Sequence, residues 1–141
     1  MKIESSNFKR LVGIWNTEGT ILSGLENSTL HGTDSYEFIL DGTCMLHKAD
    51  VMMGNEKSET FEIITLDDSV EQIKMQYYNS KGESGIMKGS LINNDFKIEG
   101  DKLKFVGMLN SDNSLLAGKW YLQSAENVWT EFIELQLTKQ N

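Results

Sequence analysis

Hydrophobic and polar residues alternate along most of this chain with a period of two. Ile73, Met75 and Tyr77 alternate with polar neighbours, and so do Phe96 and Ile98. Successive side chains of a β-strand point to opposite faces, so this pattern predicts strands with one buried face each. No proline interrupts the strand-like runs, and proline is the residue that a central strand tolerates least. The chain is therefore expected to be all-β.

Turn-forming residues recur at an even spacing, for example at Asp41-Gly42, Gly54-Asn55 and Asn93-Asn94. A strand-length run rich in β-branched and aromatic residues lies between successive turns. Only residues 4–11 have a helical pattern, which Ser5 or Ser6 could cap. About nine or ten strands joined by tight loops favour an up-and-down antiparallel barrel after a short N-terminal helix. A β-sandwich is the alternative, but it usually needs longer crossover loops.

One hairpin can be registered from its turn. Asp41-Gly42 is a strong signal for a two-residue hairpin loop. This loop pairs Phe38 with Met45 and Tyr36 with His47, so that two apolar rows coincide.

The next turn allows two registers. A two-residue loop at Gly54-Asn55 would set His47 opposite Glu62, whereas a three-residue loop through Glu56 would set it opposite Ile63. Because a shift of one residue moves every side chain to the other face, matching apolar faces favours the longer loop.

Composition and charge limit the possible functions. The 141 residues carry a formal charge of −8 and include one cysteine, Cys44. The acidic balance argues against nucleic acid and against an anionic membrane surface. A lone cysteine forms no intramolecular disulfide and no cysteine-based zinc cluster. With no apolar run typical of a signal peptide or a membrane span, we expect one cytoplasmic domain over residues 1–141.

An ordered set of segments carries a family resemblance. They are Gly13-Ile14-Trp15 after the short helix, residues 32–38 (GTDSYEF), residues 46–51 (LHKADV) and residues 117–120 (AGKW). Together they resemble lipocalin-like barrels of the calycin group, and in particular a bacterial family of single lipocalin-like domains of unassigned function. The resemblance implies structural roles for Gly13 and Trp15. Trp15 would close one barrel end, with Lys119 as the cation packed across its ring.

His47 is the sole polar residue in an otherwise apolar row that contains Met45, Ala49, Val51 and Met53. An inward-facing imidazole could bind a ligand, act as acid or base, or coordinate a metal or haem. It could equally be a core histidine that hydrogen-bonds the Tyr36 hydroxyl. Some related barrels bind haem through a histidine on a late strand. No histidine follows His47, so we expect neither haem nor a metal.

Glu131 is a second polar residue in an apolar row, between Trp129 and Ile133. If Glu131 faces inward, burial would raise its pKa and suit it to act as an acid together with His47. Glu131 could also lie in water at the barrel mouth. His31 falls in the polar segment 23–33, which we interpret as an exposed loop over one end, either a lid or merely a connection.

The apolar rows would line the barrel interior. Gly85 and Gly89 remove bulk on the row of Met87, which favours a cavity there. The residues expected to contact a ligand are Tyr36, His47, Phe61, Met75, Tyr77, Met87, Trp120 and Trp129.

The leading functional hypothesis is a protein that binds an apolar or amphipathic small molecule in the barrel. The first alternative is a cofactor-free isomerase or lyase with His47 as the base and Tyr36 or Glu131 assisting. The second is a filled barrel that acts through its surface or as a homodimer. No phosphate-binding glycine loop or nucleophile elbow is present, which argues against an NTPase or a hydrolase of those types.

Overall fold

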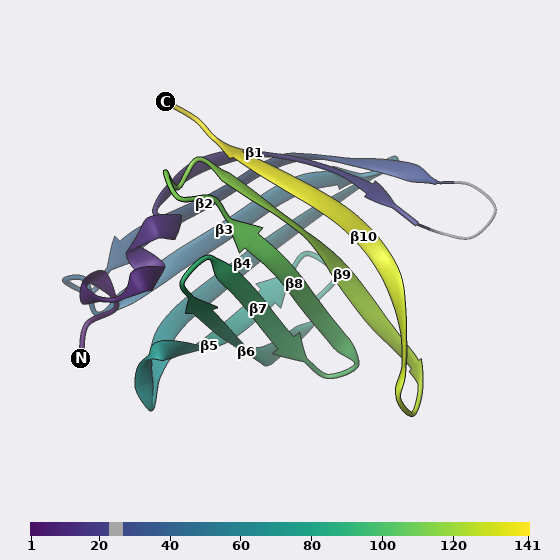
Figure 1. The fold of residues 1–141 in the computed structure, drawn as a ribbon. Coiled ribbons are helices and arrows are strands. Elements are labelled where there is room, and N and C mark those ends of the chain that lie inside the picture. Colours follow the sequence, from purple (N-terminus) through teal and green to yellow (C-terminus); the bar gives the residue numbers. More distant parts are fainter. Residues whose placement is uncertain (23–26) are drawn as a thin grey trace.

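The chain folds into a closed antiparallel barrel, shown in Figure 1 as a computed structural model that describes residues 1–22 and 27–141. Ten strands follow one another in chain order around the wall, and β1 closes the barrel by pairing with both β2 and β10. The predicted up-and-down barrel is confirmed. The strands are β1 (Gly13–Ile21), β2 (Ser28–Ile39), β3 (Cys44–Met53), β4 (Glu56–Asp67), β5 (Ser69–Asn79), β6 (Ser84–Ile92), β7 (Asp95–Gly100), β8 (Leu103–Leu109), β9 (Leu115–Ala125) and β10 (Val128–Lys139).

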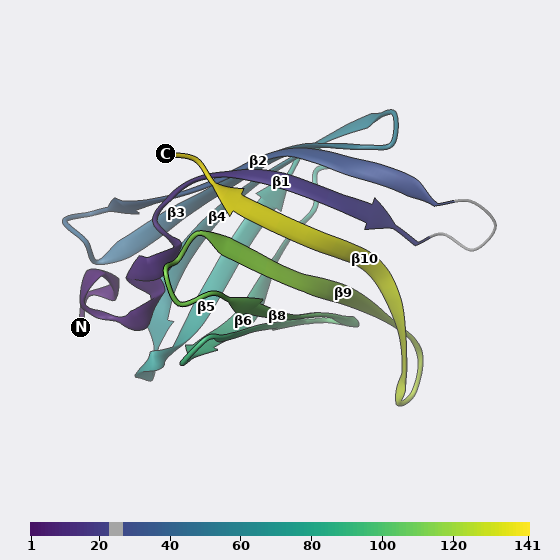
Figure 2. The same cartoon turned by 45° about the horizontal axis from the view of Figure 1, so that its top comes forward.

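Two 3-10 turns, η1 (Ile3–Ser5) and η2 (Asn7–Leu11), take the place of the expected N-terminal helix. Ser6 lies between them and caps η2 by accepting a hydrogen bond from the Phe8 amide. The turns lie against one end of the barrel (Figure 2), and their side chains Phe8 and Leu11 are completely buried. They therefore close that end and make it part of the core.

Trp15 packs beneath these turns and is completely buried. Its indole nitrogen donates a hydrogen bond of 2.9 Å to the Leu11 carbonyl. The cation across its ring is Lys139, whose Nζ lies 4.8 Å from the ring centroid. The prediction that Lys119 provides this cation is wrong. Lys139 is the partner of Trp15 in the β1–β10 ladder, whereas Lys119 lies on the outer wall and pairs with Glu131 at 3.1 Å.

Gly13 provides the space that Lys139 needs. A Cβ atom at Gly13 would lie 3.2 Å from Cδ of Lys139, and the glycine has a φ of 142°. A side chain there would be strained by the backbone and would press on the lysine stem. Gly13, Trp15 and Lys139 thus form one packing unit at the closed end.

The hairpin between β2 and β3 has the predicted register. Tyr36 pairs with His47 and Phe38 with Met45. Asp41 and Gly42 both have positive φ, at 56° and 75°, as the two-residue hairpin turn requires.

The register predicted between β3 and β4 is wrong. The loop at Gly54-Asn55 has two residues, Met53 pairs with Glu56, and His47 faces Glu62 rather than Ile63. The prediction assumed that an inward row must be apolar. Here a buried carboxylate faces the histidine, so polar complementarity takes the place of apolar matching.

A β-bulge in β10 changes which side chains face inward. Ile133 pairs with Trp120 while Glu131 pairs with Tyr121, so Phe132 is an additional residue in β10. A bulge of this kind breaks strict alternation. Trp129 and Glu131 consequently lie on the outer wall, although strict alternation would place them on the same face as Ile133.

Candidate ligand-binding site

The barrel encloses a cavity of about 430 Å³ in its lumen. The N-terminal turns close one end, since the Glu4 amide in η1 donates a hydrogen bond to the Gly42 carbonyl in the β2–β3 turn. Asn79 and Glu83, at the opposite end, are among the lining residues. Because antiparallel strands alternate in direction, the β5–β6 connection containing Glu83 lies away from those turns. The lumen therefore opens at that end.

A polar cluster lies in the wall of this otherwise mainly apolar lumen. Thr17, Asp34, His47 and Glu62 come from β1, β2, β3 and β4, four neighbouring strands. The Thr17 hydroxyl donates to Asp34 Oδ2. Nε2 of His47 lies 2.6 Å from Oδ1 of Asp34, and Nδ1 lies 2.9 Å from Oε1 of Glu62. The register places the three ionisable side chains side by side on the inner face.

The two carboxylates determine the protonation state of His47. A neutral imidazole has a single N–H, whereas both ring nitrogens of His47 face a carboxylate oxygen and can donate to both only as imidazolium. Burial, the largest single influence, lowers the pKa of His47, but the hydrogen bonds and negative charges of Asp34 and Glu62 together outweigh it and raise the pKa to about 10. At neutral pH His47 is therefore a cation that donates two hydrogen bonds.

Tyr36 covers one face of this imidazolium. The two rings lie parallel, with centroids 4.1 Å apart and an interplanar angle of 2°. Burial and the nearby charges of Asp34 and Glu62 raise the pKa of the Tyr36 phenol well above its usual value. The hydroxyl therefore stays protonated and can act as a hydrogen-bond donor in the lumen, whose wall includes Tyr36.

The structure brings together most, but not all, of the residues expected to contact a ligand. Phe61 lies on the outer wall with 44% of its surface exposed, as a consequence of the β3–β4 register. Trp129 also lies outside, where the Lys104 ammonium is 4.3 Å from its ring centroid. Glu131 is exposed on the outer wall, where it pairs with Lys119, and it forms no dyad with His47. Those that line the lumen are Tyr36, His47, Met75, Tyr77, Met87 and Trp120.

The glycines on the row of Met87 make room for neighbouring side chains. A Cβ at Gly85 would lie 2.9 Å from the Tyr77 hydroxyl oxygen, and one at Gly89 would lie 3.1 Å from the Ile73 side chain. The space that these glycines leave is thus occupied by Tyr77 and Ile73, and the glycines themselves do not line the cavity.

Sequence reasoning missed Asp34 and Glu62. Asp34 lies two residues before Tyr36 in β2, so both side chains point to the inner face. This spacing could have been read from the sequence. Glu62 could have been found from the two-residue alternative at Gly54-Asn55, which sets it opposite His47. His31, expected in a loop, lies exposed in β2. The rest of the suspected lid includes residues 23–26, which lie outside the described residues.

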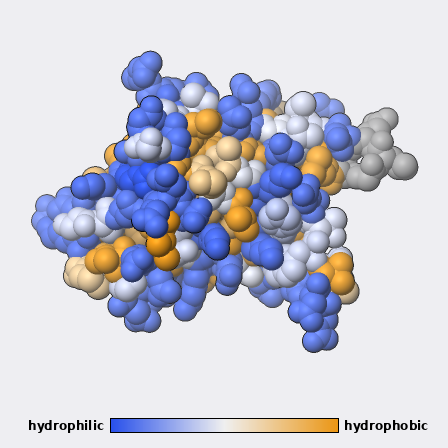
Figure 3. Space-filling view, in the orientation of Figure 1, coloured by the Kyte–Doolittle hydropathy of each residue, from blue (hydrophilic) through white to orange (hydrophobic). Residues whose placement is uncertain are grey.

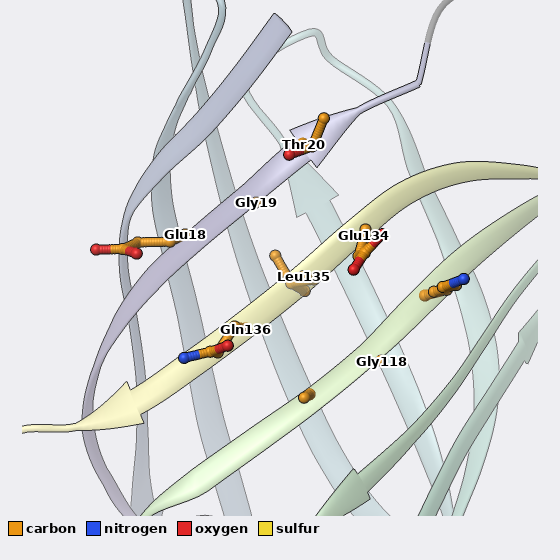
Figure 4. A pocket seen from close by; sticks show the side chains of 9 residues that line it. Glu18, Gly19, Thr20, Gly118, Glu134, Leu135 and Gln136 are labelled. Atoms are coloured by element: carbon orange, nitrogen blue, oxygen red, sulfur yellow. The ribbon is translucent and has the colours of Figure 1, made fainter. Parts of the chain in front are cut away.

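A second hollow lies on the outer wall, across β1, β9 and β10 (Figure 4). Its volume, about 540 Å³, exceeds that of the lumen, but it is an open groove over small residues such as Gly19 and Gly118. Glu18, Glu134 and Gln136 surround it and project from the strands. A groove this open would leave an apolar ligand largely in water, so the lumen is the stronger candidate site.

A metal or haem does not fit the cluster as it is arranged. Within residues 1–22 and 27–141, no group of three or more histidine, cysteine or acidic side chains is arranged to hold a metal ion. Both ring nitrogens of His47 already face carboxylates, so a metal would have to displace one of them.

In the same described part of the chain, no helix has the length and hydrophobicity to cross a bilayer.

The closed ten-stranded wall, the end closed by 3-10 turns and the lined lumen define a calycin-like barrel. Rv2717c from M. tuberculosis is similar, with a TM-score of 0.71 over 95% of each chain and 9% sequence identity. The S-type phycobiliprotein lyase CPES from Guillardia theta is similar with a TM-score of 0.66, over 100% of this chain and 94% of that one, at 11% identity. At such identities the likeness establishes the fold alone. No protein-family model and no curated protein matches the sequence.

Proposed function

We propose that this protein binds an amphipathic small molecule in the barrel lumen. The observation that supports the proposal is the cavity of about 430 Å³, lined mainly by apolar and aromatic side chains and containing the Asp34–His47–Glu62 cluster. Its volume lies within the range of about 300–1,000 Å³ typical of small-molecule sites. The bacterial lipocalin-like family suggested by the sequence, a single-domain organisation and cytoplasmic location remain predictions.

Binding is favoured over catalysis by the state of His47. A general base needs a free lone pair near neutral pH, whereas the carboxylates of Asp34 and Glu62 hold His47 as imidazolium and raise its pKa to about 10. The barrel of a phycobiliprotein lyase is similar, which leaves lyase chemistry as the second candidate. In this chain the histidine is better suited to holding the two carboxylates in place than to removing a proton.

The surface offers less support for a function through a docking partner. On the face shown in Figure 3, apolar residues are interspersed with hydrophilic ones. Scattered exposed apolar side chains are normal for a folded protein. The lumen is therefore the place to test first.

The test compares two alanine-to-tryptophan variants of the full chain. Ala49 lines the lumen, whereas Ala117 is exposed beside the outer groove. With neutral anthracene methanol as the fluorescent probe, Ala49→Trp is expected to weaken binding by at least about tenfold, because the indole occupies the cavity. Ala117→Trp should bind the probe as the unmodified protein does.

Fluorescence titration measures both affinities, and circular dichroism verifies that each variant retains the barrel. If Ala49→Trp binds the probe as tightly as the unmodified protein does, the lumen is not the site of binding. A loss confined to Ala117→Trp would assign binding to the outer wall.

A further inference from the structure

Acidic side chains outnumber basic ones in the lumen. Asp34, Glu62 and Glu83 line it as acids, and His47 is the sole basic residue among the described residues that line it. Three carboxylates and one imidazolium give the lumen a net charge of −2 (−3 + 1). The buried part of the cluster alone, with Asp34, His47 and Glu62, retains one negative charge. Burying an uncompensated charge is costly, so this lumen favours a positively charged ligand.

Two polar atoms deep in the lumen lack a protein partner within the described residues. Tyr36 is 5% exposed and Glu62 is 2% exposed. No described group hydrogen-bonds the Tyr36 hydroxyl or Oε2 of Glu62, yet no fully buried side-chain oxygen in that part of the chain is left unsatisfied. Both atoms must therefore contact the open space of the cavity. They offer a carboxylate acceptor and a phenol oxygen to whatever enters.

Aromatic rings form much of the remaining wall. Phe105 lies between Phe96 and Trp120, with ring centroids 5.9 Å and 5.2 Å away, and all three line the lumen together with Tyr77. Aromatic faces attract cations and also pack against flat apolar groups. An anionic headgroup has no such support. Both N–H groups of His47 are directed at Asp34 and Glu62, and no lysine or arginine is among the described lining residues.

We propose that the ligand of this lumen is a cation, namely a protonated basic nitrogen attached to a flat apolar body. The inference rests on the proposed binding function and assigns the chemical class of the ligand. The nitrogen would donate to Glu62 near Tyr36, and the apolar body would pack against Phe105 and Trp120.

The experiment uses three tricyclic aromatic probes of similar size and shape, which differ mainly in charge: aminoacridinium, anthracene methanol and anthracene carboxylate. Equilibrium fluorescence titrations at neutral pH and low salt measure their affinities for the full chain. Aminoacridinium is expected to bind at least about tenfold more tightly than anthracene methanol, and anthracene carboxylate more weakly than both.

Charge-neutralising variants locate the effect. Glu62→Gln should reduce the affinity for aminoacridinium while leaving that for anthracene methanol nearly unchanged. Since Glu62 also holds His47, this variant could lose the fold, and Glu83→Gln at the mouth provides a second test with the same expected direction. Glu37→Gln is the matched control, because Glu37 is exposed on β2 and does not line the lumen.

The outcomes separate the two proposals. Equal affinity for the cationic and neutral probes, or tighter binding of the carboxylate, would overturn the cationic ligand and leave lumen binding standing. Cation binding that Glu37→Gln weakens as much as Glu83→Gln does would also overturn it, as a long-range effect of net charge. Failure of all three probes to bind would overturn both proposals.

Discussion

At the scale of single residues, His47 is held between opposing requirements. Burial disfavours its charge, and the carboxylates of Asp34 and Glu62 stabilise that charge. A buried ionic cluster of this kind is often no more stable than an apolar one of the same volume, whereas removing one member is strongly destabilising. Stability alone thus does not account for the cluster. Recognition of a polar group on a ligand would account for it.

The protonation state of His47 can be measured directly. Replacing the other histidine in His31→Gln leaves His47 as the sole histidine of the chain. We expect its ring carbon-bound protons to keep imidazolium chemical shifts at neutral pH and to titrate with a midpoint of about 10. NMR spectroscopy over a pH series makes the measurement. A midpoint near 6.5, the ordinary value, would show that Asp34 and Glu62 do not both hold the ring.

At the scale of strands, alternation predicted the barrel and the inner row of β3, because most strands keep strict period-two alternation. It failed where a local feature altered the register. The bulge at Phe132 shifts Trp129 and Glu131 to the outer wall, and period alone does not reveal an added residue. The β3–β4 register failed for a different reason, since the inner row of β4 contains the polar Glu62 opposite His47.

The same strand geometry assigns the cation at the closed end. Lys139→Met is expected to lower the free energy of unfolding by about 1 kcal/mol, because Lys139 lies over the Trp15 ring and donates to the Arg10 carbonyl at 3.0 Å. Lys119→Met, which removes an exposed pair with Glu131, should cause no measurable change. Denaturant unfolding of both variants gives the comparison. A larger loss in Lys119→Met would restore the role that the family resemblance implied.

At the scale of the whole molecule, the formal charge of −8 and the acidic lumen act in the same direction. A negative surface raises the local concentration of cations near the mouth, and the lumen carboxylates then act at short range. Composition alone predicts that the surface is negative. The acidic lumen, by contrast, depends on Asp34 and Glu62 facing inward beside His47, which follows from the register of β2, β3 and β4.

Stability of the whole barrel should depend on the charge of His47. Its folded-state pKa of about 10 lies above the ordinary value of 6.5. The folded protein therefore binds this proton more tightly than the unfolded chain does. The resulting stabilisation is fully present below pH 6.5 and is lost as the pH rises through about 10. Across that window the free energy of unfolding should fall by at most about 1.4 kcal/mol per pH unit from this single group.

Guanidinium unfolding at several pH values between 6.5 and 10 tests this expectation against His47→Gln, which has no titrating ring. The variant should be less stable at neutral pH, because Asp34 and Glu62 lose the cation that lies between them. Its stability should decline less steeply with pH than that of the unmodified protein, because the proton released by His47 is absent. Tyrosine and lysine side chains also titrate towards the upper end of the window, and they are common to both proteins. Equal slopes would attribute the whole decline to those groups, and His47 would then not be the imidazolium that the geometry requires.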